Sequence, residues 1–300
     1  MKCYICDSRD FKDVMPYYAA SFDEPFKNCR IVKCKKCGLN QVNKEFTFEQ
    51  IDHYYKNNYQ RSAWYKFSLP DFPGDNLFSV SRGRSLAKLF KEQADVLPAQ
   101  VLDLGCGYGH LLYGFQQHFP GAKYTGVEFD ENTKFPLEKI GAKFRFGGVE
   151  DVADLKGTFD LLITSHVFEH VIDPHDFLER CIELLKPGGY LLFEMPNMNE
   201  FNLRCDHNHS PHICLWEIET LEKIFLEHKL EIVFLKTAGK KHAWLEALED
   251  GFVKKLFRML ARPFKDKPST VDITDKNSIG FELDKYGDNR RNLRILAKRK

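Results

Sequence analysis

A glycine-rich stretch at residues 101–109, Val-Leu-Asp-Leu-Gly-Cys-Gly-Tyr-Gly, constrains the fold of this chain more than any other feature. An apolar segment runs directly into glycines at alternate positions and then into a helical pattern. In such a strand–turn–helix unit the backbone turns tightly and approaches a ligand closely, as in sites for adenosine-bearing cofactors. A dinucleotide fingerprint needs a further glycine at position 110 or 112. His110 and Leu112 stand there, which weakens the dinucleotide interpretation.

Two acidic residues complete the motif. Asp103 lies at the end of the first predicted strand, where a carboxylate can hold the turn or bind the amino group of a cofactor. Glu128 ends the next predicted strand, residues 122–128, where a carboxylate can accept hydrogen bonds from both ribose hydroxyls. The pattern D-x-G-x-G-x-G resembles motif I of the class I S-adenosylmethionine-dependent methyltransferases. A glycine turn in a Rossmann-like fold without methyl chemistry is the alternative.

Later segments extend this resemblance. A third strand is expected near residues 142–146, and a fourth begins at Thr158 and leads into a loop that ends in Glu169-His170. A helix over 174–185 is closed by Lys-Pro-Gly-Gly at 186–189, and a fifth strand follows at 190–195. This order resembles the Methyltransferase 11/23 group of small-molecule methyltransferases, over about residues 80–240 and the last strand.

The resemblance implies an α/β fold with a Rossmann-like seven-stranded sheet in the order 3-2-1-4-5-7-6. Strand six is expected at 230–236, and the final strand, 292–298, is expected to be antiparallel between strands five and six. S-adenosylmethionine is the implied cofactor. Its implied binding residues are Asp103, Gly105, Cys106, Gly107, Gly109, Glu128, Phe129, Val149, Glu150, Ser165 and His166.

The N-terminus carries a second strong pattern. Cys3-x-x-Cys6 and Cys34-x-x-Cys37 are separated by 27 residues. Two such turns make a closed four-thiolate site for a structural zinc ion. The alternatives are redox-active pairs or core cysteines without metal, and Cys29 is a spare thiol that can replace one ligand.

We therefore predict a zinc-binding module at 1–45, an aromatic-rich linker and helix at 46–95, and a methyltransferase domain at 96–300 with a basic helical insertion near 241–265. Residues 70–74 resemble a boundary turn, and residues 78–94 an amphipathic helix. The linker either folds over the cofactor as a lid or packs against the zinc module. As a lid, Tyr59 with Arg82 or Arg84 meets the methionine carboxylate.

Two groups of residues are candidates for proton transfer. His166, Glu169 and His170 follow the fourth strand, at the sheet edge where open α/β sheets bind ligands. A histidine titrates near neutrality and suits a general base, although His170 can instead cap or pack. Asp206, His207, His209 and His212 precede a helix expected over 217–228. These histidines bind or deprotonate the acceptor, stabilise the loop, or hold a divalent metal with Asp206.

Charge and composition restrict the partners. The formal net charge is +1, which does not favour nucleic acid, and no long apolar run predicts a membrane span. We therefore expect a cytoplasmic protein. Residues 252–300 hold 14 Lys and Arg against 6 Asp and Glu. The basic helix at 251–265 contacts a membrane surface weakly, attracts a phosphorylated acceptor, or packs on the domain.

The four-cysteine module ahead of this motif set resembles sugar methyltransferases. We therefore expect O-methylation of a sugar or nucleotide-sugar hydroxyl, as in surface polysaccharide synthesis. One alternative is an RNA-base methyltransferase with a zinc finger. The other is a non-catalytic protein that binds zinc and cofactor. The sequence does not decide the oligomeric state.

Overall fold

The computed structural model describes residues 1–19, 24–57, 77–206, 209, 211–241, 283–288 and 290–300. Four predictions from the sequence lie outside these residues: Tyr59, His207, the boundary turn at 70–74 and the basic helix at 251–265.

A seven-stranded sheet forms the centre of the molecule, in the order β10-β11-β8-β7-β4-β5-β6. Adjacent strands from β6 to β8 are parallel, and β11 runs antiparallel to both of its neighbours. The predicted strand order and the antiparallel last strand are confirmed. The strands are β4 (Gln100–Leu104), β5 (Lys123–Glu128), β6 (Lys143–Phe146), β7 (Phe159–Ser165), β8 (Leu185–Pro196), β10 (Glu231–Ala238) and β11 (Asn292–Lys298).

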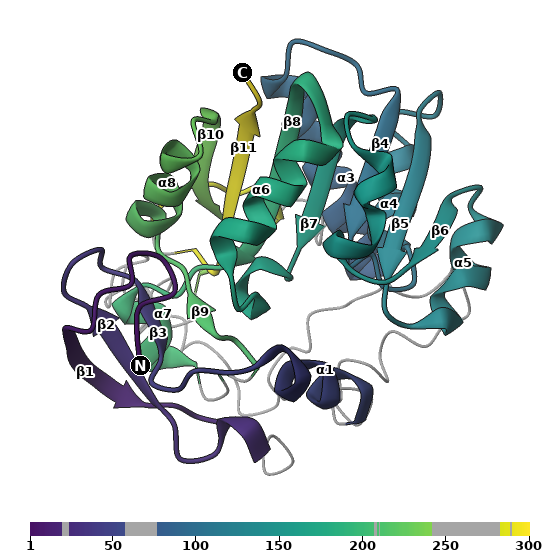
Figure 1. Ribbon diagram of the computed structural model, residues 1–300. Helices are drawn as coiled ribbons and strands as arrows, with labels where there is room; N and C mark the ends of the chain where they lie inside the picture. Colours follow the sequence, from purple (N-terminus) through teal and green to yellow (C-terminus); the bar gives the residue numbers. More distant parts are fainter. Residues whose placement is uncertain (20–23, 58–76, 207–208, 210, 242–282, 289) are drawn as a thin grey trace, which may run out of the picture.

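Helices cover both faces of this sheet (Figure 1). Because side chains alternate along a strand, Leu102 and Leu162 face α6 and α8, while Val101 and Leu161 face α3, α4 and α5. No helix among the described ranges is long and apolar enough to cross a membrane. The α-helices are α1 (Phe48–Asn57), α3 (Leu77–Gln93), α4 (His110–Gln116), α5 (Lys134–Lys139), α6 (Pro174–Leu184), α7 (Glu200–Cys205) and α8 (Ile218–Glu227). The 3-10 helices are η1 (Glu24–Phe26), η3 (Glu131–Thr133), η4 (Val149–Leu155) and η5 (Phe168–His170).

One boundary differs from its prediction. Helix α6 ends at Leu184, as the Lys-Pro-Gly-Gly segment indicated, but β8 begins at once, at Leu185. Leu185 pairs with Phe159 of β7. The glycines therefore lie in an irregular first part of the strand rather than in a separate turn. The pairing of β8 to its neighbour over-rides the local turn signal.

A second, four-stranded sheet has the order β1-β2-β3-β9. It consists of β1 (Phe11–Pro16), β2 (Arg30–Cys34), β3 (Asn40–Val42) and β9 (Cys214–Leu215). The sequence did not reveal β9, because two residues are too short for a strand pattern. In Figure 1 this sheet and α1 lie on the side where the parallel strands of the large sheet end.

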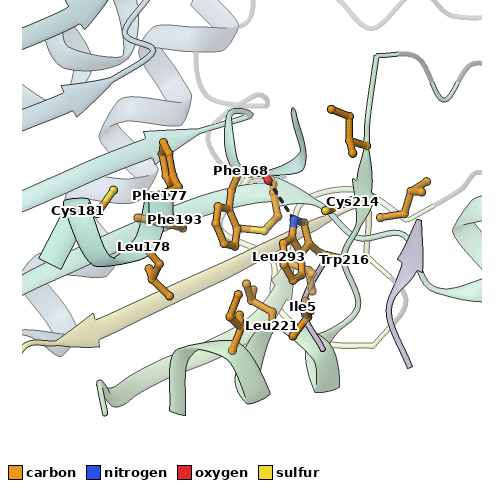
Figure 2. Close-up of a cluster of buried hydrophobic side chains, with 14 of the residues drawn as sticks. Ile5, Phe168, Phe177, Leu178, Cys181, Phe193, Cys214, Trp216, Leu221 and Leu293 are labelled. Atoms are coloured by element: carbon orange, nitrogen blue, oxygen red, sulfur yellow. Dashed lines mark hydrogen bonds between the residues drawn. The ribbon is translucent and has the colours of Figure 1, made fainter. Parts of the chain in front are cut away.

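The hydrophobic core continues from the N-terminal segment into the large domain. Figure 2 shows Ile5 in one cluster with Trp216 and Leu221, and Phe168 lies beside them. The rings of Phe168 and Trp216 are stacked, with centroids 4.7 Å apart and planes at 5°. The division at residue 45 stays a prediction, since this cluster runs across it.

The crossing of α3 and α4 depends on two glycines. A Cβ added at Gly83 would lie 2.0 Å from the carbonyl oxygen of Leu111, and one added at Gly114 would lie 2.0 Å from that of Val80. Each glycine thus lets one helix rest on the backbone of the other. This close approach fixes α3, which carries Arg82 toward the carboxyl end of the sheet.

We predict that Gly114→Ala separates the two helices. Overpacking against a backbone carbonyl should lower the free energy of unfolding by about 3 kcal/mol. Gly121→Ala is the matched control, because a Cβ there meets nothing within 4 Å. Urea unfolding of both variants measures the effect. Equal stability of the two variants would show that the helices can move apart at no cost.

Candidate functional site

The glycine turn follows β4 and is held by Glu128, the last residue of β5. The carboxylate of Glu128 accepts hydrogen bonds from the backbone N–H groups of Gly107, at 2.9 Å, and Phe129, at 2.8 Å. Burial raises its pKa, while these two hydrogen bonds act to lower it. A carboxylate has about four acceptor positions, so Glu128 keeps capacity for the hydroxyls of a ligand.

Two features of the turn fit a bound cofactor. The Oδ2 atom of Asp103 is buried without a hydrogen-bond partner among the described residues, and burial raises the pKa of this carboxyl well above its usual value. A Cβ added at Gly107, where φ is +50°, would meet nothing within 4 Å. The turn thus presents open space and an unsatisfied acceptor, which suit the methionine end of the cofactor.

Three residues predicted to bind the cofactor, Phe129, Val149 and Glu150, lie at or just after the ends of β5 and β6. Phe129 and Phe146 are half exposed and meet edge to face, with ring centroids 6.5 Å apart. A Cβ added at Gly148 would come within 2.8 Å of the Phe129 ring and 2.7 Å of the Glu150 carboxylate. Val149 is buried beside them. An exposed aromatic ring next to a carboxylate suits a flat, polar ring such as adenine.

The loop after β7 closes over the glycine turn. A Cβ added at Gly105 would lie 2.5 Å from Cγ2 of Val167, so the two segments touch. His166 has a positive φ of 59°, and its N–H donates to the carbonyl oxygen of Glu194 at 2.8 Å. Such a conformation in a non-glycine residue costs free energy and is found most often at functional sites. The hydroxyl of Ser165 has no partner within the described residues.

Three histidine rings surround the carboxylate of Glu169, and we call these four residues the carboxylate–histidine cluster. From Oε1 of Glu169, Nδ1 of His166 lies at 3.2 Å, Nε2 of His170 at 3.7 Å and Nε2 of His212 at 3.9 Å. The Glu169 side chain is only 2% exposed. Neither of its oxygens accepts a well-formed hydrogen bond from any described residue.

The negative charge of Glu169 depends on the charge of the neighbouring histidines. Burial acts to raise the pKa of Glu169, and positive charge on the neighbouring histidines is what holds it at about 2. Yet burial lowers the pKa of His212 to about 3 and also lowers that of His170. We take the burial of the rings to dominate, because desolvation is the largest influence on the pKa of both rings. Near neutral pH these two rings are uncharged, and the carboxylate lacks a counter-charge from them.

His209 has a different setting from the other candidate bases. Its Nδ1 accepts the N–H of Tyr18 at 3.0 Å, so the hydrogen is on Nε2, which faces the carbonyl oxygen of Leu203 at 3.2 Å. Its own N–H donates to the carbonyl oxygen of Tyr18 at 2.7 Å. Both ring nitrogens are engaged and the side chain is fully buried. This setting favours loop stabilisation, one of the predicted alternatives, over the role of a base.

Arg82 contributes to a buried network of charges. Its Nε lies 2.9 Å from Oε1 of Glu194, whose other oxygen accepts from Nε of Arg294 at 2.5 Å. Glu194 and Arg294 are fully buried. The sequence analysis missed this pair, although a charged residue between apolar neighbours in each of two strands was the available signal. Nε2 of His166 lies 3.9 Å from Glu194, so the network is adjacent to the carboxylate–histidine cluster.

The four predicted metal-binding cysteines lie together. The ligand atoms of Cys3, Cys6, Cys34 and Cys37 are all within 4.8 Å of one another. The contact with Cys37 lowers the pKa of Cys3 to about 5. A tetrahedral zinc site with Zn–S bonds of about 2.3 Å has sulfur–sulfur edges of about 3.8 Å, so the donor set fits zinc. Cys29 lies outside this group.

The cysteine cluster is connected to the carboxylate–histidine cluster through β9. Asn40 and Gln41 of β3 pair with Leu215 and Cys214, and His212 lies just before that strand. The hydroxyl of Tyr17 donates to the carbonyl oxygen of His212 at 2.9 Å. The N-terminal segment thus positions one ring of the candidate acceptor site.

A family described as a methyltransferase domain matches residues 76–235, more than half of the chain. The chain belongs to this methyltransferase family. It is therefore an enzyme, and the assigned family agrees with the glycine turn and the strand order.

Named relatives match shorter parts of this methyltransferase. The ubiquinone biosynthesis O-methyltransferase of Coxiella burnetii is 30% identical over 118 residues, 37% of this chain and 50% of the relative. The trans-aconitate 2-methyltransferase of Deinococcus radiodurans is 33% identical over 120 residues, 38% and 41% of the two chains. The chain thus spans half the length of these relatives or less. A solved methyltransferase from Thermotoga maritima shares the fold, with 17% identity, a TM-score of 0.51 and coverage of 83% and 98%.

We predict that Gly107→Ala abolishes high-affinity binding of S-adenosylmethionine while the protein stays folded. The added methyl group would occupy the open space of the turn. Gly141→Ala is the matched control, because Gly141 also has a positive φ and no neighbour within 4 Å. Both variants should lose about 1 kcal/mol of stability from the left-handed conformation. Calorimetric titration with the cofactor separates them, and equal affinities would contradict the placement of the cofactor.

Proposed function

We propose that this methyltransferase uses S-adenosylmethionine to methylate a hydroxyl group of a small polar acceptor, with a sugar or nucleotide-sugar as the favoured class. The carboxylate–histidine cluster is the observation that supports O-methylation most directly. An alcohol is a poor nucleophile until its proton is removed or its oxygen is bound by a cation. The cluster lies against the glycine turn and can supply that assistance.

When bound, the cofactor would supply a methyl group on a positively charged sulfur, which would leave with the carbon–sulfur electron pair as the acceptor oxygen bonds to the methyl carbon. The residues of the chain align the two reactants, which is the larger part of the acceleration in such a transfer. Asp103, Gly107 and Glu128 hold the cofactor side. His166, Glu169, His170 and His212 surround the acceptor hydroxyl and assist the loss of its proton.

Two further observations support the proposal. Ubiquinone biosynthesis O-methyltransferase, a relative over half of its own length, is named for methyl transfer to oxygen. The N-terminal four-cysteine module resembles that of sugar methyltransferases. A phenolic acceptor is the competing small-molecule class, because it agrees with the first observation alone.

We also propose that Cys3, Cys6, Cys34 and Cys37 hold a structural zinc ion. Four thiolates complete a tetrahedral shell and leave no position for substrate. The ion would tie the start of the chain to the end of β2. It would thereby fix β3, on which β9 is paired.

Release of S-adenosylhomocysteine with a panel of acceptors tests the function. The panel contains nucleotide-sugars, a catechol, trans-aconitate and structured RNA. Turnover on a sugar hydroxyl is the expected result, and Glu169→Gln should reduce kcat by about a hundredfold or more. Turnover on RNA alone, or on a carboxylate alone, would overturn the proposal. Turnover on the catechol alone would keep O-methylation and reject the sugar.

Zinc content of purified variants tests the second proposal. Cys34→Ser and Cys37→Ser should each lose the metal and melt at lower temperature, because an incomplete shell binds zinc weakly. Cys29→Ala is the matched control, since Cys29 is buried in the same segment but lies outside the cysteine cluster. Atomic emission spectroscopy should give one zinc per chain in the control. Full zinc content in both serine variants would refute a four-cysteine site.

A further inference from the structure

The carboxylate–histidine cluster has the donor set of a metal site, separate from the four cysteines. One ligand atom from each of Glu169, His170 and His212 lies within 4.8 Å of the others. They come from the loop after β7 and from the residues ahead of β9, which are 42 positions apart or more along the chain. The fold therefore brings these three donors together, rather than a local helix turn.

The tautomer inferred for His170 directs a lone pair at the carboxylate of Glu169. Nδ1 of His170 lies 3.3 Å from the carbonyl oxygen of Pro211. A carbonyl only accepts, so Nδ1 carries the hydrogen and Nε2 presents its lone pair toward Glu169, 3.7 Å away. Two acceptors that face each other at this distance repel unless a proton or a metal cation lies between them.

The buried carboxylate is the second, independent observation. Glu169 is 2% exposed, and neither of its oxygens has a hydrogen-bond partner among the described residues. Nδ1 of His212 also has none. An unsatisfied buried carboxylate costs several kcal/mol, and folded proteins keep one where it coordinates a ligand or an ion.

The surroundings have the second layer of contacts typical of metal sites. A ligating histidine usually donates its other N–H to a backbone carbonyl or a carboxylate, which fixes the ring. Pro211 provides such a carbonyl for His170. Nδ1 of His166 lies 3.2 Å from the carboxylate, outside the triad, without forming an aligned hydrogen bond. The orientation of the His170 ring is thus already set by the protein.

We propose that Glu169, His170 and His212 bind one divalent transition-metal ion that coordinates the acceptor hydroxyl. Two imidazoles and one carboxylate suit ions such as Mn²⁺, Co²⁺ or Fe²⁺, and three protein ligands leave positions open. The bound ion would lower the pKa of the acceptor hydroxyl, whose proton passes to solvent or His166 as the oxygen attacks the methyl group. This assignment rests on the proposed O-methyl transfer for its chemistry, but metal binding itself does not.

Binding of Mn²⁺ to the zinc-loaded protein tests the proposal. Mn²⁺ prefers oxygen and nitrogen donors, so it does not compete for the four cysteines. Electron paramagnetic resonance should count one bound Mn²⁺ per chain. Glu169→Gln and His212→Gln should each weaken binding by at least about tenfold. The control is His118→Gln, an exposed histidine outside the cluster, which should bind like the wild type.

Thermal unfolding and cofactor titration accompany each variant, so a misfolded protein is recognised. Unchanged Mn²⁺ affinity in both folded variants, or no specific Mn²⁺ in the wild type, would overturn the metal site. If the wild type turns over equally well in chelator, the cluster acts through its own side chains, and the metal proposal fails while O-methylation stands. If Mn²⁺ binds as expected but no hydroxyl acceptor reacts, the site stands and the proposed function fails.

Discussion

The segment from His212 to Trp216 links the N-terminal sheet to the large domain, because its backbone and side chains form hydrogen bonds with both. On one side its backbone pairs with β3 of the N-terminal sheet, where the N–H of Val42 also donates to the carbonyl oxygen of Ile213. On the other side the N–H of Ile213 donates to the carbonyl oxygen of Glu169 at 2.8 Å, and Nε1 of Trp216 reaches that of Phe168 at 3.3 Å. The loop after β7 and the N-terminal segment therefore both form hydrogen bonds with the same five residues.

The buried ion pairs of Glu194 are a second constraint, next to the candidate site. Removing an ion pair such as Glu194 and Arg294 from water is costly, and one partner alone would be far worse. Here the carboxylate has two guanidinium partners, Arg294 and Arg82, from β11 and α3. The network joins the last strand of the chain to the helix before the first strand of the large sheet. It also fixes Glu194, whose backbone carbonyl oxygen accepts the N–H of His166.

Much of the large domain was predictable because local patterns there agree with the final packing. The glycine turn, Glu128 at a strand end and the alternation of strands with helices all reflect short-range rules. The order of the seven strands came from the family resemblance. Within the sheet, the main error in the prediction was the first residue of β8, where pairing with β7 outweighed a local turn signal.

The candidate site was harder to predict, because its residues meet only through tertiary structure. His166, Glu169 and His170 were recognised from one loop, but His212 was grouped with His207 and His209 instead. No sequence signal shows that His209 turns its ring nitrogens to the backbone of Tyr18 and Leu203. Nor does sequence show that β9 exists. Such facts depend on contacts between segments about 170 to 190 residues apart.

The continuous core has a consequence for how this protein can vary. Independent domains can be gained, lost or exchanged because each buries its own apolar surface. Here Ile5, Phe168 and Trp216 belong to one cluster, so the N-terminal segment shares its core with the large domain. Cutting the chain after β3 would leave Trp216 facing water and β9 without a partner. The N-terminal segment and the catalytic domain should therefore unfold as one cooperative unit, and recombination between such enzymes would have to carry both together.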